Sequence, residues 1–293
     1  MIPADEHPQR PGPEPLWADS WYVDFSGPDG LGGFVQISLY PNLGEGGRGS
    51  GVAWWWTYLV KPDSPLVAVR DHQVALPRGG LEIRADGLWA ELVCETPLEH
   101  WSIGLEAFGV AFDDRAEAWR REWGDRLAVG LDLEWEALGP PVPGPGPGPA
   151  GAGYVQAGRV IGTVLLDEER IEVDRPGLRA RSWGVSDWWA VAEGGSSDLP
   201  VVGHWAASLE PGGGFIVFGP SDADLVEVSA DPQGVPVRAV WCRDGERWEA
   251  TVLGAAPVLV TGPHGSARLA RGLCRFTGPG HDGTGWAEWL LAT

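Results

Sequence analysis

Few features that would mark a nucleic-acid-binding or membrane protein are present in this sequence. Its 293 residues include one lysine, Lys61, and one methionine, and the formal net charge is −20 because 21 Lys and Arg face 41 Asp and Glu. A charge of that sign repels phosphate backbones and anionic lipid surfaces, so we expect no nucleic-acid partner. No apolar run approaches the length that crossing a bilayer requires, and we therefore expect no membrane span.

Sequence motifs for metal, nucleotide and hydrolase sites are also missing. The three cysteines, Cys94, Cys242 and Cys274, are far apart, and the six histidines form no H-x-x-x-H pair, so neither a disulfide framework nor a metal site is expected. Phosphate-binding glycine motifs before a helix and a G-x-S-x-G elbow are absent, and we expect no cofactor. The proline-rich N-terminus lacks the apolar core of a secretory signal, which predicts a cytoplasmic location.

The residues that are abundant indicate an all-β protein. The chain has 44 glycines, 26 prolines and 18 tryptophans, a composition typical of many turns and short elements. Aromatic and β-branched runs such as 17–25, 33–40 and 52–60 predict strands. Asp86-Gly87 predicts a two-residue hairpin turn, and acids at the start with Gly124 as a stop predict one helix over 113–124.

A glycine- and proline-rich segment divides the chain nearly in half. Residues 139–153 consist of six glycines, six prolines, two alanines and one valine, a composition of low helix and strand propensity. We therefore predict an N-terminal β domain over 17–138, a linker over 139–153 and a C-terminal β domain over 154–293, each a barrel or sandwich.

The most distinctive stretch follows this segment. Residues 177–189 contain two arginines, one carboxylate and three tryptophans, and Arg179, Arg181 and Trp183 alternate so that an extended strand places them on one face. Indole rings supply contact area and guanidinium groups fix orientation, which favours a ligand site. The alternative is that the tryptophans are core and the arginines are paired structurally.

At Gly177-x-Arg179-x-Arg181-Ser182-Trp183-Gly184 the sequence resembles a lipocalin-like, two-domain family related to hydroxyneurosporene synthase (carotenoid 1,2-hydratase) and the AttH-like proteins. Further matching stretches are Trp21-Tyr22-x-Asp24-Phe25, Trp54-Trp55-Trp56-Thr57 and Gly283-x-Gly285-Trp286-Ala287-Glu288. The sequence departs from the family pattern at Ala180, where an acid is expected, and at Ser186, where an arginine is expected. The resemblance implies two packed β domains with a ligand cavity, and carotenoid hydration or polyene cyclisation as activities.

Two carboxyl groups stand among indoles. Asp187 precedes Trp188, and Glu288 lies between Trp286 and Trp289. Desolvation can keep such a carboxyl protonated, and indole faces stabilise a carbocation, so either group could protonate an alkene. The alternatives are a turn or an Arg181 ion pair for Asp187, a surface position for Glu288, and satisfied half-buried histidines at His100 and His204.

We expect a cofactor-independent cyclase, hydratase or isomerase of natural-product biosynthesis that holds an apolar isoprenoid or polyene in a tryptophan-lined cavity. A polyene cyclisation would need only positioning and one hydrogen bond. The alternative is a non-catalytic carrier of a hydrophobic small molecule. The candidate catalytic residues are Asp187, Glu288 and Arg181. The candidate substrate-binding residues are Trp54, Trp56, Tyr58, His72, Arg179, Trp183, Trp188, Trp189, His204 and Trp286.

Overall fold

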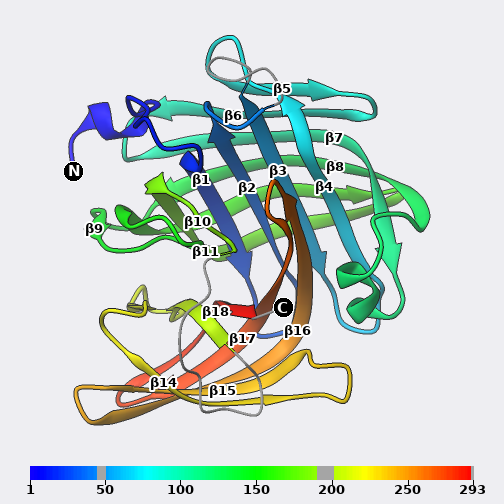
Figure 1. Ribbon diagram of the computed structural model, residues 1–293. Helices are drawn as coiled ribbons and strands as arrows, with labels where there is room; N and C mark the ends of the chain where they lie inside the picture. Colours follow the sequence, from blue (N-terminus) through cyan, green and yellow to red (C-terminus); the bar gives the residue numbers. More distant parts are fainter. Residues whose placement is uncertain (45–50, 190–200, 292–293) are drawn as a thin grey trace.

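The computed structural model describes residues 1–44, 51–189 and 201–291, and it shows two antiparallel sheets (Figure 1). The predicted all-β class is confirmed. The strands are β1 Trp17–Ser26, β2 Gly32–Tyr40, β3 Val52–Val60, β4 Leu66–Ala75, β5 Leu81–Ala85, β6 Leu88–Thr96, β7 His100–Phe112, β8 Asp125–Ala137, β9 Val142–Pro143, β10 Ala152–Leu166, β11 Glu169–Val185, β12 Val201–Leu209, β13 Phe215–Phe218, β14 Asp224–Ala230, β15 Pro236–Arg243, β16 Glu246–Gly262, β17 Gly265–Gly278 and β18 His281–Leu291. Neither 3₁₀ helix of the described residues, η1 Pro3–Glu6 or η2 Arg115–Trp119, has the length and apolar character that crossing a membrane requires.

The first sheet curls into a ring. Its strand order is β4-β3-β2-β1-β11-β10-β8-β7-β6-β5, and pairing of β4 with β7 closes the ring. Alternation along β1 sends Trp21, Val23 and Phe25 into the ring, whereas Ala18 and Tyr22 face the second sheet. Apolar side chains pack against one another inside the ring, and the cavity lined by Val23, Phe25 and other apolar residues there is about 10 Å³. That is too small for an organic ligand.

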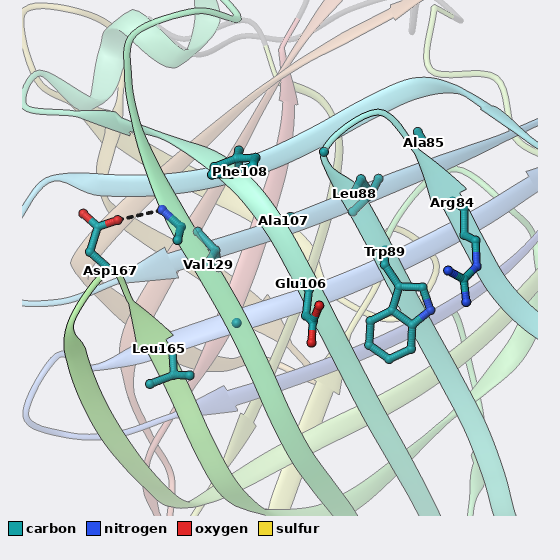
Figure 2. Close-up of a pocket in the computed structure, with 13 residues that line it drawn as sticks. Arg84, Ala85, Leu88, Trp89, Glu106, Ala107, Phe108, Val129, Leu165 and Asp167 are labelled. Carbon is teal, nitrogen blue, oxygen red and sulfur yellow. Dashed lines mark hydrogen bonds between the residues drawn. The ribbon is translucent and has the colours of Figure 1, made fainter.

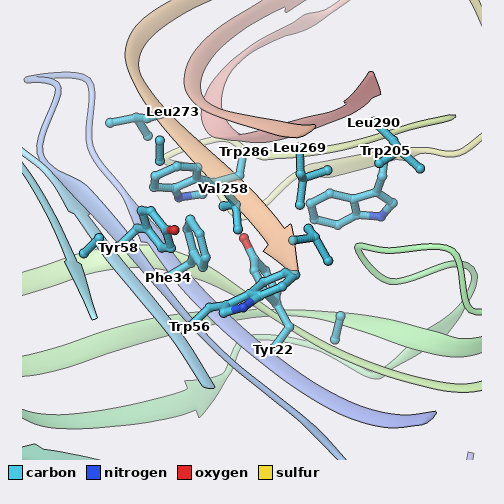
Figure 3. Packing of buried hydrophobic residues seen from close by; sticks show 14 of the residues in the cluster. Tyr22, Phe34, Trp56, Tyr58, Trp205, Val258, Leu269, Leu273, Trp286 and Leu290 are labelled. Atoms are coloured by element: carbon cyan, nitrogen blue, oxygen red, sulfur yellow. The ribbon is translucent and has the colours of Figure 1, made fainter. Parts of the chain in front are cut away.

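The second sheet is open and packs against the ring. Its order is β13-β12-β18-β17-β16-β15-β14. One apolar cluster joins the two sheets (Figure 3): Tyr22, Phe34 and Tyr58 come from the ring, and Val258 and Trp286 come from the second sheet. The rings of Phe34 and Trp286 meet edge to face with their centroids 5.1 Å apart. Because this cluster is continuous, residues far apart in the chain meet between the sheets.

The change from one sheet to the other does not fall at the glycine- and proline-rich segment. Strands β10 and β11, which follow it, pair with β8 and β1 and so belong to the ring. The division of sheets lies instead between Val185, at the end of β11, and Val201, at the start of β12. Composition reveals where regular structure is interrupted, but it does not reveal which strands pair afterwards.

The helix predicted over 113–124 is much shorter than expected. Only the 3₁₀ helix η2 forms, and the side chain of Asp114 caps it by accepting the N–H of Ala116 at 3.0 Å. Strand β7 runs to Phe112 and β8 begins at Asp125, and Ala111 pairs with Asp125, so the two ends of the segment between them lie side by side. A straight helix over this segment would be about 18 Å long and would hold the two ends apart. Pairing of β7 with β8 therefore overrides the local helical signal.

Candidate functional site

A pocket of about 520 Å³ lies over strands β12 and β18 of the second sheet, within the range of small-molecule sites. It is lined by segments from both halves of the chain. The lining residues are Pro145, Gly146, Gly148, Pro149, Ala150, Gly151, Asp187, Trp188, Val202, Gly203, His204, Trp205, Pro220, Ser221, Glu288 and Leu290. Four of the sequence-predicted site residues, Asp187, Trp188, His204 and Glu288, therefore meet in one place.

Residues 144–151, which we call the strap, form one wall of this pocket. The indole Nε1–H of Trp205 donates to the carbonyl of Pro145 at 2.9 Å, and the N–H of Gly148 donates to Glu288 Oε1 at 2.8 Å. Gly148 has φ of +97°, and a Cβ added there would come within 3.0 Å of the Trp188 ring. Close approach of strap and indole thus depends on a glycine at this position.

Replacing Gly148 with alanine should displace the strap. The added methyl group strains a left-handed backbone and meets Trp188, so we expect a loss of roughly 1–2 kcal/mol in the free energy of unfolding and faster proteolysis within residues 139–153. Gly144→Ala is the matched control, because a Cβ there meets nothing within 4 Å. Equal protease sensitivity of both variants would show that the strap does not rely on Gly148.

Glu288 is buried, contrary to a surface position, and its carboxylate is held from two sides. Arg271 donates to Oε2 through Nε at 2.8 Å and Nη2 at 2.7 Å, and the strap N–H of Gly148 donates to Oε1. The Arg271 guanidinium also donates to Gln36 Oε1 at 2.6 Å and lies 4.5 Å from the centroid of the Phe34 ring. Among the described residues, the hydrogen-bond partners of Glu288 are N–H donors, so its carboxyl oxygens act as acceptors.

Asp187 and Trp188 also line the pocket. Asp187 is half-buried, and its Oδ1 accepts the N–H of Trp189 at 3.0 Å, so it takes part in a turn and not in an ion pair with Arg181. Trp188 is buried, and its Nε1–H donates to the Tyr40 hydroxyl at 2.9 Å. That hydrogen bond uses the polar edge of the indole and leaves the ring to border the pocket.

The surroundings of His204 favour the neutral form of its imidazole. Burial lowers its pKa from the usual value. Its Nε2 lies 3.1 Å from the carbonyl oxygen of Ala223, which can only accept, so Nε2 carries the proton. The lone pair of Nδ1 is therefore available as a base at neutral pH.

Arg179, Arg181 and Trp183 share one face of β11, as predicted, but this face belongs to the ring and not to the pocket. Arg179 is paired with Glu6 at 2.7 Å, and Arg181 with Asp19 at 2.5 Å. Trp183 is near the ring of Tyr154, at 6.5 Å. These arginines are thus engaged structurally, the alternative that the sequence left open.

The remaining predicted residues lie in the aromatic packing behind the pocket. Trp56 is 5.4 Å from Trp188 between ring centroids, and its Nε1–H donates to His72 Nε2 at 2.8 Å. The others pack around this pair or deeper between the sheets; they are Trp54, Tyr58, Trp189 and Trp286. Most of this group supports the wall without lining it.

Sequence reasoning missed Trp205, Arg271 and the strap as parts of the site. Trp205 adjoins the predicted His204, and its aromatic character was a usable signal. The strap was recognised by composition, but only as a linker. Arg271 carried no local signal, since its partners Glu288 and Gln36 are brought to it by strand pairing and sheet packing.

A second hollow of about 680 Å³ lies on the ring, along strands that include β6, β7 and β8 (Figure 2). Phe108 and Leu165 at its rim are exposed to 62% and 42%. Asp167 there accepts the N–H of Ala128 at 2.7 Å. None of the sequence-predicted site residues lines this hollow, and its polar groups are not buried between sheets.

Comparison with known proteins supports the fold. A family described as a domain of unknown function (DUF7064) matches residues 2–195, and no curated protein matches the chain. An AttH-like protein from Nitrosomonas europaea superposes with a TM-score of 0.58 at 14% identity, over 94% of this chain and 92% of its own. Kievitone hydratase from Nectria haematococca superposes at 0.53 with 8% identity, over 95% and 90%. The predicted resemblance to AttH-like proteins and the lipocalin-like fold are thereby confirmed.

Proposed function

The chain belongs to the family of the domain of unknown function DUF7064, and we propose that it is a cofactor-independent hydratase, isomerase or cyclase. Its substrate is an apolar isoprenoid or polyene, bound in the pocket over β12 and β18. The observation that carries this proposal is the pocket itself, where two indoles, two carboxyl groups and a neutral imidazole converge. Apolar pockets with a few convergent polar groups are the usual form of such sites.

In this proposal His204 is the base. Its Nδ1 accepts a proton from one substrate atom, or from a water that adds to the substrate, and later returns it to another substrate atom. The negative charges of Asp222 and Asp224, which act on His204, stabilise the imidazolium that forms when Nδ1 takes the proton, and Trp188 and Trp205 hold the apolar body of the substrate. The Arg271–Glu288 pair keeps the Glu288 carboxylate and the strap in place.

The fold gives limited additional support. One protein with this fold is named a hydratase, for kievitone. A shared fold alone does not carry a function, so the proposal depends on the pocket of this chain. Arg181, a candidate from the sequence, has no part in it because it lies in the ring against Asp19.

Replacing His204 with glutamine tests the proposal. Panels of polyenes and terpenoids are first screened for binding by tryptophan fluorescence and for conversion by mass spectrometry. For a converted compound, His204→Gln should lower kcat by at least about 100-fold and change affinity little. Because burial lowers the pKa of His204, wild-type turnover should decline only below the ordinary histidine range, as pH falls.

His100→Gln is the control, since His100 pairs with Glu134 on the ring and lies outside the pocket. A compound that binds tightly and is recovered unchanged would identify a carrier instead of an enzyme. Unchanged kcat in His204→Gln would remove His204 from the mechanism.

A further inference from the structure

The ionisable side chains at the pocket are mainly acidic. Asp187 and Glu288 are the ionisable carboxyl groups in its lining, and Asp222 and Asp224 act on His204 from nearby. No lysine or arginine is among the lining residues of the described chain.

The nearest cation, Arg271, does not offset this charge. Its guanidinium is buried and contacts Glu288 Oε2 at 2.7 Å, so one positive and one negative charge are already matched. Asp187 is left without a cationic side chain among the described residues, and its pairing with Arg181 is excluded by the Arg181–Asp19 contact. The wall of the pocket thus carries an uncompensated carboxylate beside two indoles.

Carboxylates and indole faces recognise the same kind of group. An ammonium head is attracted by a nearby carboxylate through Coulomb interaction and by the π-face of tryptophan. The Nε1–H groups of Trp188 and Trp205 already donate hydrogen bonds to the Tyr40 hydroxyl and the Pro145 carbonyl. The two indole rings therefore have no free N–H donor for an anion. The net charge of −20 adds a favourable field for cations.

We infer that the pocket selects ligands that carry an ammonium group on an apolar body and rejects the corresponding carboxylic acids. This inference rests on the proposed function, because it concerns the same pocket, and it narrows the substrate class. Asp187 is the residue that determines the selectivity, through its charge, while Trp188 and Trp205 hold the apolar body. A cationic intermediate formed from a neutral polyene would benefit from the same arrangement.

Three probes of one skeleton test the inference: 4-phenylbutylamine, 4-phenylbutanol and 4-phenylbutyrate, titrated into the full chain at pH 7 with calorimetry. We expect the amine to bind at least about tenfold more tightly than the alcohol, since a partly solvated charge pair supplies that much, and the acid to bind most weakly. Raising the ionic strength from 0.02 M to about 0.5 M should reduce the preference, because salt screens a half-exposed carboxylate.

Asp187→Asn should bring the amine-to-alcohol ratio of affinities close to one without weakening the alcohol. Asp132→Asn is the matched control, since it removes the same charge from an exposed position on β8 and should leave the ratio unchanged. Equal binding of all three probes to the wild type, or tightest binding of the acid, would overturn the inference while leaving the pocket intact. Failure of all three to bind would also overturn the inference, whereas the proposed function is tested separately by the panel of polyenes and terpenoids.

Discussion

Glu6→Ala is expected to lower the free energy of unfolding by about 3–5 kcal/mol, the usual cost of removing one partner from a buried ion pair. Glu6 is buried within η1, and its carboxylate is bound by Arg179 at 2.7 and 2.8 Å, by the Tyr154 hydroxyl at 2.8 Å and by the N–H of Leu98 at 2.8 Å. Its loss leaves the Arg179 guanidinium unpaired between Trp101 and Trp135. Urea unfolding measures the effect.

A double-mutant cycle separates the pair from its surroundings. Arg179→Met should destabilise on its own, but combined with Glu6→Ala it should cost much less than the sum of the two. Asp174→Ala, at the exposed pair with Arg159, is the control and should hardly change stability. If Glu6→Ala and Asp174→Ala had equally small effects, the N-terminal segment would not be anchored to the ring by this contact.

Asp24→Asn is expected to stabilise the protein at pH 8 and to leave its stability at pH 4 nearly unchanged. Asp24 is fully buried on β1 with Oδ1 accepting the N–H of Leu178 at 3.0 Å, and burial raises its pKa to about 7. Between about pH 4 and 7 the native state keeps a proton that the unfolded chain releases, so stability falls as pH rises. The rise in the pKa of Asp24, about three units, corresponds to a loss of about 4 kcal/mol in the free energy of unfolding once the pH exceeds both values. Asparagine keeps the acceptor oxygen and carries no charge.

His72 acts in the opposite direction and supplies the comparison. Burial lowers the pKa of His72 to about 3, so from pH 6.5 down to 3 the unfolded chain binds the extra proton and stability falls as pH falls. Between pH 4 and 6.5 the contributions of Asp24 and His72 to the pH dependence of stability have opposite signs in the wild type. In Asp24→Asn only the His72 effect remains, so the free energy of unfolding should fall as pH falls. In His72→Gln only the Asp24 effect remains, so the free energy of unfolding should fall as pH rises. Parallel curves for wild type and Asp24→Asn would mean that Asp24 is ionised in the folded protein at all these values.

Local sequence patterns predicted most strands and their turns because these depend on neighbouring residues. The Asp86-Gly87 hairpin is present, with Ala85 paired to Leu88 and Gly87 at φ of +73°. The shared face of Arg179, Arg181 and Trp183 also follows from the period of two along an extended strand. The helix over 113–124 was overestimated, since the pairing of Ala111 with Asp125 brings the two ends of this segment together.

The candidate site was predicted only in part. Asp187, Trp188, His204 and Glu288 line the pocket, and each was marked by an adjacent indole in the sequence. The role of acid suggested for Glu288 does not agree with its surroundings, because Arg271 and Gly148 already donate to both of its oxygens. No pattern around residue 288 reveals a partner at 271 or a strap at 148.

The sequence by itself determined the β class, the positions of turns, the acidic charge and the interrupted segment at 139–153, since all of these arise from composition or from neighbours along the chain. Only the tertiary structure decided which charges are paired and where a ligand can enter. Arg181 meets Asp19 across 162 positions because β1 and β11 are adjacent in the ring. The strap meets Glu288 across 140 positions because the two sheets pack face to face. Such contacts depend on strand order and sheet packing, which short-range periodicity does not encode.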